Sequence, residues 1–487
     1  MPNHWPPSNA LPYVPTESET DVLSSDQECF DPELVEGWGW IEVFIVIQLM
    51  WGVLLFIPGM QPFRAYIRAL PYVTSLAALI YYFQRAAGEL LPPGAGWLVA
   101  SFGLLALNLF HEETQVLAGI AQIVFQISIA APAFWVACIV RSKARFLRIL
   151  WVIFGASLIS AAVGVLQVYY PELFLPPEFS ALALRINPAF VESLTYVGAN
   201  GESIIRPPGV TDLPGGAGIA GTMTMVLGVA LATHGHRSRV VRAACFGAAG
   251  IGMTVLYLTQ IRSLTILAVV SVLIFAALRL RQGHVVQGGA IAITGTVLVV
   301  ASFTWALAVG GEAISERFAG LGSSGFLSTF QANRGIFLDY TLNELLFQFP
   351  FGAGLGRWGM MEVYFGDRSV WQFPPIHVEI QPTGWLLDGG VLMWICYGGA
   401  LAAAVRYGYL IAVRSASQSL QYFAAIVLSI QLMIIGFCFS GPAFNTQLGI
   451  EFWAVTAALF GVAQKWQTWH ETEAPAGMES DEEDCPS

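Results

Sequence analysis

The sequence predicts an all-α, polytopic membrane protein, and two observations lead to this fold class. Of the 487 residues, 55% are hydrophobic and only 11% are charged, and the mean hydropathy is +0.63. Soluble domains carry about 25% charged residues, so a soluble core cannot absorb this much apolar surface. Apolar stretches of about 17–25 residues also recur along the chain, and each is long enough to cross a bilayer as a helix.

We expect about twelve transmembrane helices. The predicted spans cover residues 38–58, 66–84, 95–111, 115–140, 147–169, 213–234, 241–259, 263–280, 286–309, 382–405, 418–438 and 446–464. Only Gln260 and Arg262 interrupt the apolar run between the seventh and eighth spans. The first span has no basic leader and is long enough to cross, so we do not expect a signal peptide.

The basic residues orient this predicted bundle, because connections on the cytoplasmic side are enriched in Lys and Arg. Four connections are basic, and all four fall on one side when twelve helices alternate. Their basic residues are Arg141, Lys143, Arg145 and Arg148, then Arg237, Arg239 and Arg242, then Arg279 and Arg281, and finally Arg406 and Arg414. We therefore expect both termini in the cytoplasm and two large outward-facing loops, at 170–212 and 310–381.

The two ends of the chain are acidic. Residues 1–37 and 466–487 together hold 15 of the 33 acids and no Lys or Arg, which leaves 18 acids against 22 bases in residues 38–465. Both ends are rich in Pro, Ser and Glu, so we predict two disordered cytoplasmic tails around one membrane domain. A docking segment for a cytoplasmic partner and a plain solvated extension are both consistent with this composition.

The second outward loop is far longer than a usual connection between helices. Residues from Thr329 to Phe347 space their apolar side chains with a helical period, which predicts an amphipathic helix near the membrane surface, ended by Pro350. The segment from Gly352 to Gly356 follows no strand, so we interpret it as a close-approach turn rather than a nucleotide-binding loop.

Three residues suit chemistry on a lipid-linked diphosphate at the outer face. Arg206 and Arg262 supply planar forks of donors that match phosphate oxygens. His377 is a natural general base for an acceptor hydroxyl. Taken singly, each has a plainer interpretation: Arg262 can reach the interface from a helix end, Arg206 can be an ordinary loop charge, and His377 a hydrogen-bonded loop histidine.

These residues lie in patterns that resemble the O-antigen ligase and O-antigen polymerase superfamily of bacterial inner-membrane glycosyltransferases, over residues 200–405. The matching segments are Arg206-Pro-Pro-Gly209 before Pro214, Thr259-Gln-Ile-Arg262-Ser263, Arg334 followed by Pro350-Phe-Gly352-Ala-Gly354-Leu-Gly356, and His377 before Gly384-Trp-Leu-Leu-Asp388-Gly-Gly390. The chain departs from the family where Val378 stands for Asn, Ile261 for Ser and Asp388 for Glu.

The resemblance implies a GT-C-like bundle in the bacterial inner membrane that transfers a glycan from undecaprenyl diphosphate, with inversion and without metal or cofactor. It implies that Arg206 and Arg262 hold the diphosphate and that His377 activates the acceptor. The further substrate-binding residues that we predict are Arg334, Arg317, Arg64, Arg68, Gly352 and Gly354. The six cysteines show no spacing typical of a metal site or a disulfide framework.

The expected partners follow from this picture. They are the lipid-linked glycan, an acceptor glycan, lipid or protein, the bilayer, and polysaccharide export and assembly proteins, with no nucleic acid. The motifs do not separate a polymerase, which we favour slightly, from a ligase. A transporter or flippase of polysaccharide intermediates and a non-enzymatic scaffold of envelope assembly are the alternatives. The scarcity of ionisable residues in the middle of the spans disfavours transport.

Overall fold

The computed structural model of the chain describes residues 38–83, 91–175, 195–211, 215–234, 238–323, 328, 330–367 and 375–473. About 80% of the described residues are helical, and the strands of the described part are one short antiparallel pair, β1 (Thr195–Val197) and β2 (Ser203–Ile205). The all-α fold class is therefore confirmed. The predicted N-terminal tail, and the C-terminal tail from residue 474, lie outside the described residues.

Helices occupy all twelve stretches that hydropathy predicts as spans. They are α1 (Trp40–Met50), α2 (Arg64–Phe83), α3 (Ala95–Asn108), α4 (Val116–Ala130) with α5 (Pro132–Ile139), α6 (Lys143–Tyr169), α10 (Ala217–Thr233), α11 (Arg239–Thr259), α12 (Arg262–Arg281), α13 (Val285–Ser323), α18 (Gln381–Arg414), α19 (Gln418–Phe437) and α20 (Gln447–Glu473). Helix α20 thus extends into the segment predicted as the C-terminal tail.

Seven helices in the described part are long and apolar enough to cross a membrane. Their bounds are Val116–Ile139, Lys143–Tyr169, Arg239–Thr259, Arg262–Arg281, Val285–Ala319, Gln381–Arg414 and Gln418–Phe437. Three shorter apolar helices cover Trp40–Phe56, Ala95–Asn108 and Ala217–Thr233. These helices indicate a membrane protein. That twelve helices cross the membrane in alternating directions stays a prediction.

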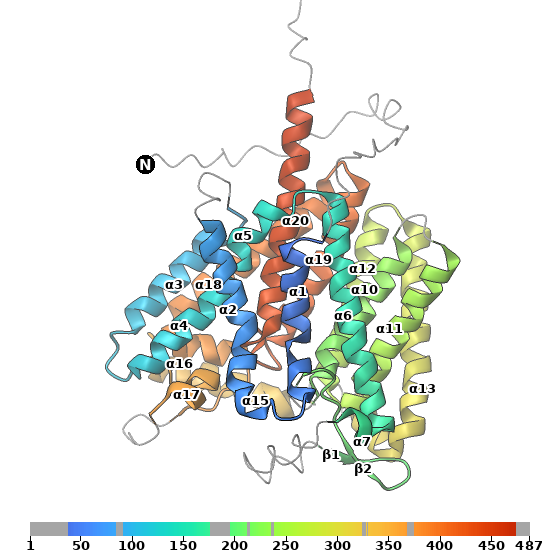
Figure 1. Ribbon diagram of the computed structural model, residues 1–487, viewed down its shortest axis with the longest axis horizontal. Coiled ribbons are helices and arrows are strands. Elements are labelled where there is room, and N and C mark those ends of the chain that lie inside the picture. The colour runs from blue at the N-terminus through green and yellow to red at the C-terminus, as the bar shows by residue number, and fades with distance from the viewer. Residues whose placement is uncertain are drawn as a thin grey trace, which may run out of the picture.

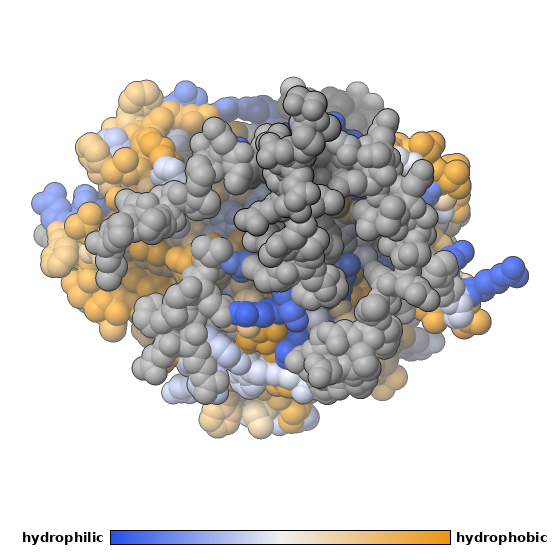
Figure 2. All heavy atoms as spheres, turned by 90° about the horizontal axis from the view of Figure 1, so that it is seen from above, coloured by the Kyte–Doolittle hydropathy of each residue, from blue (hydrophilic) through white to orange (hydrophobic). Residues whose placement is uncertain are grey.

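The helices pack side by side into a bundle whose smaller elements gather at one end (Figure 1). Helix α1 begins at the upper edge in that view, and α20 ends there. The strands β1 and β2 and the short helices α7 (Pro171–Phe174), α15 (Ile336–Tyr340), α16 (Leu346–Gln348) and α17 (Gly359–Phe365) lie toward the lower edge. Figure 2 shows the upper end face-on, where many described side chains at the rim are apolar, as a bundle surrounded by lipid requires.

Close packing of α10 on α11 explains why α10 is rich in small residues. A Cβ atom at Gly221 would lie 2.7 Å from the carbonyl oxygen of Gly252, and one at Gly252 would lie 2.6 Å from the carbonyl oxygen of Gly221. Only glycine lets the two backbones approach this closely. The contact fixes the lower end of α11, where Gln260 and Arg262 follow, against the lower end of α10.

The predicted amphipathic helix is present from Phe330 to Gln348, and Thr329 lies outside the described residues. It contains two π-helical turns, Gln331–Gly335 and Thr341–Leu345. Thr341 and Leu345 are buried, whereas Phe347 is exposed, so one side of this helix packs on the bundle. The outward position of the whole loop stays a prediction.

Helix α18 is broken at Gly389 and Gly390, the second of which has a φ of +66°. The break opens two backbone groups that bind the preceding loop. The N–H of Val391 donates to the carbonyl of Pro350 at 3.0 Å, and the N–H of Ala353 donates to the carbonyl of Leu387 at 2.8 Å. The end of the long loop is therefore built into α18 by backbone hydrogen bonds.

Candidate functional site

Arg206, Arg262 and Arg317 come from three separate segments and converge at the lower end of the bundle. Arg262 Nη1 donates to the carbonyl oxygen of Arg317 at 3.4 Å. The charges of Arg206 and Arg262 both act on the Arg317 guanidinium, so the three side chains share one region. No described carboxylate forms an ion pair with any of them. We call these three residues the arginine cluster, and its uncompensated positive charge suits an anion.

Gln260 contacts this cluster through its backbone, which has an unusual conformation. Its φ is +56°, and it is the one non-glycine residue in the described part with a positive φ. A left-handed conformation costs a non-glycine residue about 1–2 kcal/mol. Its carbonyl oxygen accepts a hydrogen bond from Arg317 Nε at 3.0 Å. The sequence gives no sign of this geometry, because glutamine has no preference for it.

Two buried donors in this region have no hydrogen-bond partner among the described residues. They are Nε of Arg206 and Nε2 of Gln260. Burial also lowers the pKa of the Arg206 guanidinium from its ordinary value, against a smaller raising effect of Tyr196. Unpaired buried donors cost free energy, although the described part has others away from this cluster, such as Nε1 of Trp135 and Nε1 of Trp385.

The loop after Arg206 is anchored at Gly209. Gly209 has a φ of +64°, and its backbone N–H and C=O both bond to the side chain of Gln167, at 2.9 and 2.7 Å. A Cβ atom at Gly209 would lie 2.5 Å from Ser160 Oγ. The N–H of Gly215 donates to the carbonyl of Arg206 at 3.1 Å. Helix α6 therefore fixes this loop, while Pro214 lies outside the described residues.

His377 belongs to a second group, with Glu379 and Arg334. His377 Nε2 lies 2.7 Å from Glu379 Oε1, and Arg334 Nη1 forms an ion pair with Glu379 Oε2. The His377 side chain is 73% exposed. Burial lowers the pKa of the Arg334 guanidinium below its ordinary value. We call these three residues the histidine group. Sequence reasoning missed Glu379, although its spacing of two from His377 in an extended segment was the available signal.

The structure thus divides the predicted site residues into two sets. Hydrogen bonds and charge interactions join Arg206, Arg262 and Arg317, and separate contacts join His377 to Arg334 through Glu379. Both sets lie toward the lower edge of the bundle in Figure 1, near β2 and α15. Direct contact between Arg206, Arg262 and His377 is not among the described interactions.

Gly352 and Gly354 are buried in packing contacts. Their φ values are +106° and +83°. A Cβ atom at Gly354 would lie 2.8 Å from the backbone of Glu113 and Thr114, in the turn between α3 and α4. Beside them, buried Arg357 forms an ion pair with Glu113 and donates to the carbonyl of Ala353 at 3.0 Å. The observed contacts of both glycines are with the protein itself, and their part in substrate binding stays a prediction.

Arg64 begins α2, and Arg68 lies one turn later, at the lower edge of the bundle. Arg68 Nη1 donates to the hydroxyl of Tyr364 at 3.2 Å and contacts Sδ of Met360 at 3.6 Å. Both partners are on α17, so Arg68 connects α2 to the long loop. The predicted place of these two arginines beside a diphosphate is not tested by these contacts.

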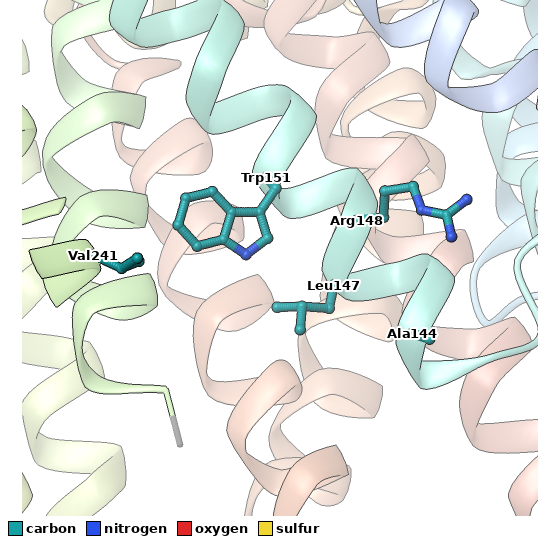
Figure 3. Close-up of a pocket in the computed structure, with 5 residues that line it drawn as sticks. All are labelled: Ala144, Leu147, Arg148, Trp151 and Val241. Atoms are coloured by element: carbon teal, nitrogen blue, oxygen red, sulfur yellow. The ribbon is translucent and has the colours of Figure 1, made fainter. Parts of the chain in front are cut away.

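A shallow depression lies elsewhere, between α6 and α11 near their upper ends. Ala144, Leu147, Arg148, Trp151 and Val241 line it (Figure 3). Trp151 points toward Val241, whereas Arg148 points to the other side of α6, where its Nη1 lies 3.7 Å from buried Glu42. The depression shares no residue with the arginine cluster or the histidine group, so we assign it no role in the site.

The side chains of the two groups are of types that can bind an anion and transfer a proton. Among the described residues no group of three or more His, Cys, Asp and Glu side chains could hold a metal ion. Three arginines and two unpaired donors fit phosphate oxygens, and an imidazole held by a carboxylate fits a general base. Comparison of the chain with protein-family models and with curated proteins finds no match. The family resemblance of the sequence motifs therefore stays a prediction.

Proposed function

We propose that the protein transfers a glycan from undecaprenyl diphosphate to an acceptor hydroxyl at the outer face of the bacterial inner membrane. The observation that carries this proposal is the arginine cluster with its two unpaired buried donors. In such a reaction the leaving group is a pyrophosphate, which gains negative charge as the bond to the sugar breaks. Fixed cations at a membrane surface both bind this group and stabilise the developing charge.

The arginine cluster is suited to this role because it is rigid. Gln167 fixes the loop after Arg206, the turn at Gln260 fixes Arg317, and Arg262 begins a long helix. Preorganised donors stabilise a transition state better than flexible ones, because little reorganisation accompanies the reaction. The free N–H groups at the start of α12 add a partial positive charge in the same region.

The histidine group supplies the acid–base part of the reaction in this proposal. His377 takes the proton of the acceptor hydroxyl while the hydroxyl oxygen attacks the anomeric carbon from the side opposite the diphosphate. The bond between the anomeric carbon and the diphosphate oxygen breaks, and that oxygen keeps the electron pair. The anomeric configuration is therefore inverted, and the products are the lengthened or newly attached glycan and undecaprenyl diphosphate.

One observation favours the alternative of a transporter or flippase. Glu451 is buried in α20, with 6% of its surface exposed, and its Oε2 atom has no hydrogen-bond partner among the described residues. Ionisable groups inside membrane bundles often mark transport pathways. The other buried acids of the long helices are paired, Glu42 with Arg145 and Arg148 and Asp388 with Trp358 and Gln122. We favour transfer because Glu451 stands alone.

An in-vitro transfer assay tests the proposal. Purified protein in detergent is given an undecaprenyl-diphosphate-linked glycan in the presence of EDTA and without nucleotide. Lengthened lipid-linked chains would identify a polymerase, and transfer that requires an added lipid or protein acceptor would identify a ligase. Absence of turnover with every donor, together with Glu451-dependent movement of the lipid-linked glycan across vesicles, would replace the proposal with the transporter alternative.

A further inference from the structure

The segment Pro375–Ile380 carries an arrangement that the motif around His377 does not explain. It belongs to no helix or strand, Ile380 at its end has an extended backbone, and the N–H of Ile376 donates to the carbonyl of Arg357 at 2.8 Å. Ile376 and Val378 pack on the small core of Ala353, Trp358 and Leu387. Side chains alternate along an extended segment, so His377 and Glu379 share the opposite side. The apolar anchors therefore place an imidazole and a carboxylate together.

Glu379 uses both carboxylate oxygens. Oε1 lies 2.7 Å from His377 Nε2, and Oε2 is paired with Arg334 Nη1. Arg334 comes from a π-helical turn, an uncommon local structure that is found frequently at functional sites. The ring of Phe337, one turn further along the same helix, lies 6.1 Å from the His377 ring between centroids. Among the described residues, the imidazole thus has one hydrogen-bond partner, Glu379, and one neighbouring ring, Phe337.

This geometry decides which imidazole nitrogen is basic. An ionised carboxylate only accepts hydrogen bonds, so the nitrogen that faces Glu379 carries the proton. In a neutral imidazole, the other nitrogen then has the free lone pair. The Arg334 guanidinium favours the ionised form of Glu379 by charge and by hydrogen bonding.

We propose that Glu379 is a positioning residue that fixes His377 with its proton on Nε2, so that Nδ1 is the atom that takes the proton of the acceptor hydroxyl. This inference rests on the proposed function for its chemical step. In that step the O–H bond of the acceptor breaks, its proton moves to Nδ1, and its oxygen forms the bond to the anomeric carbon as the diphosphate leaves. Glu379 stays ionised and balances the charge of the resulting imidazolium.

A simpler role for Glu379 would be a surface ion pair with Arg334 that only stabilises the loop. The two roles differ in what the carboxylate does to the imidazole. If the pair were purely structural, Glu379 would not determine which nitrogen of His377 carries the proton. Loss of Glu379 would then lower the amount of folded protein but not the kcat of the molecules that fold. The test therefore measures the imidazole directly, and then separates turnover from donor affinity.

The direct measurement is an NMR spectrum of the full chain in detergent with ¹⁵N-labelled histidine, recorded at a pH where imidazole is neutral. The chain has seven histidines, and the His377→Gln variant identifies the signal of interest. We expect a protonated Nε2 whose proton is shifted downfield by the charge-assisted hydrogen bond to Glu379. This signal should be lost in Glu379→Ala and kept in Glu344→Gln, which alters an exposed acid of the same loop.

The kinetic arm compares the same variants. We expect Glu379→Ala to lower kcat by up to about 10²-fold, which is part of the roughly 10²- to 10⁴-fold contribution of a general base. The KM for the lipid-linked donor should not change, and formate should restore part of kcat by replacing the carboxylate. Glu379→Gln, which keeps an acceptor oxygen but loses the charge, should fall between Glu379→Ala and the wild type.

Two results would overturn the inference. If wild-type His377 carries its proton on Nδ1, the basic nitrogen is Nε2 and the inference is wrong. If the downfield Nε2 proton persists in Glu379→Ala, Glu379 does not position the imidazole. Failure of the proposed function would give a different result: the wild type would show no glycan transfer. The NMR measurement of the protonated nitrogen does not depend on turnover and would still report whether Glu379 positions His377.

Discussion

The arginine cluster and the histidine group lie toward the same end of the bundle but differ in burial and in the pairing of their charges. In the first region, Nε of half-buried Arg206 and Nε2 of buried Gln260 are donors with no partner among the described residues, and backbone hydrogen bonds anchor both segments. His377 in the second region is mostly exposed and its partner Glu379 is neutralised by Arg334. The difference is consistent with the division of labour that we propose, between a site for an anion and an accessible site for a hydroxyl.

The arginines also differ in whether they have a carboxylate partner. The described carboxylates leave Arg206, Arg262 and Arg317 without an ion pair, whereas Arg334 and Arg357 are each paired with a glutamate. An arginine that already has a carboxylate partner has less to gain from a phosphate. We therefore expect the unpaired arginines to contribute more to anion binding than the paired ones, while the predicted substrate-binding role of Arg334 stays a prediction.

The largest effect is expected from the histidine group. His377→Ala should lower turnover by about 10²- to 10⁴-fold, because a positioned general base contributes that much. The KM for the lipid-linked donor should stay close to that of the wild type, since the donor diphosphate is held elsewhere. Initial rates at varied donor concentration measure both quantities, and a large rise in KM with unchanged kcat would contradict the division of labour.

The next effect is expected from the arginine cluster. Arg262→Ala should lower turnover by about 10²- to 10³-fold, the range for removing one preorganised donor that stabilises a developing negative charge. Affinity for the donor should fall in the same variant. Arg239→Ala removes an exposed arginine at the opposite end of α11 and serves as the matched control. Equal losses in both variants would indicate a general effect of net charge.

A third prediction concerns the loop that holds Arg206. Gly209→Ala should destabilise the protein by about 1–3 kcal/mol, because alanine is strained at a positive φ and its Cβ would meet Ser160. Gly155→Ala, also near this packing in α6, is the control, since a Cβ there meets nothing within 4 Å. Thermal unfolding in detergent measures the difference, and equal stability of the two variants would refute the proposed anchoring of the loop.

The smallest effect is expected from relieving the turn at Gln260. Gln260→Gly removes the strain of a left-handed glutamine and should raise stability by up to about 1 kcal/mol. It also removes the unpaired Nε2 donor, so donor affinity should fall by about tenfold, as expected for one hydrogen bond to a charged group. Unfolding and donor-binding curves should therefore move in opposite directions. A variant that is both less stable and equally active would exclude a role in binding.

Hydropathy and periodicity were sufficient to predict the helices. The twelve predicted stretches are all helical, and the helix before Pro350 is present because its apolar residues recur every three or four positions. These signals are local, and a helix needs no distant partner to satisfy its backbone. Whether all twelve cross a membrane depends on lipid, which the sequence pattern describes only through length and composition.

The candidate site was predictable only in part. Arg206, Arg262 and Arg317 could be chosen from their residue type and place, but their convergence depends on how α10, α11 and α13 pack. Gln260 was missed because its contact with the arginine cluster depends on a backbone conformation that glutamine rarely adopts. The predicted substrate contact of Gly352 and Gly354 stays a prediction, and sequence alone could not show their packing on α18 and on the turn before α4.

The most direct test of the division of labour is binding of undecaprenyl diphosphate to three purified proteins: the wild type, Arg262→Ala and His377→Ala. Our account predicts that Arg262→Ala loses most of its affinity for this ligand, while His377→Ala binds it as tightly as the wild type and yet does not transfer glycan. Equal loss of binding in both variants, or full binding by Arg262→Ala, would contradict the assignment of the diphosphate to the arginine cluster.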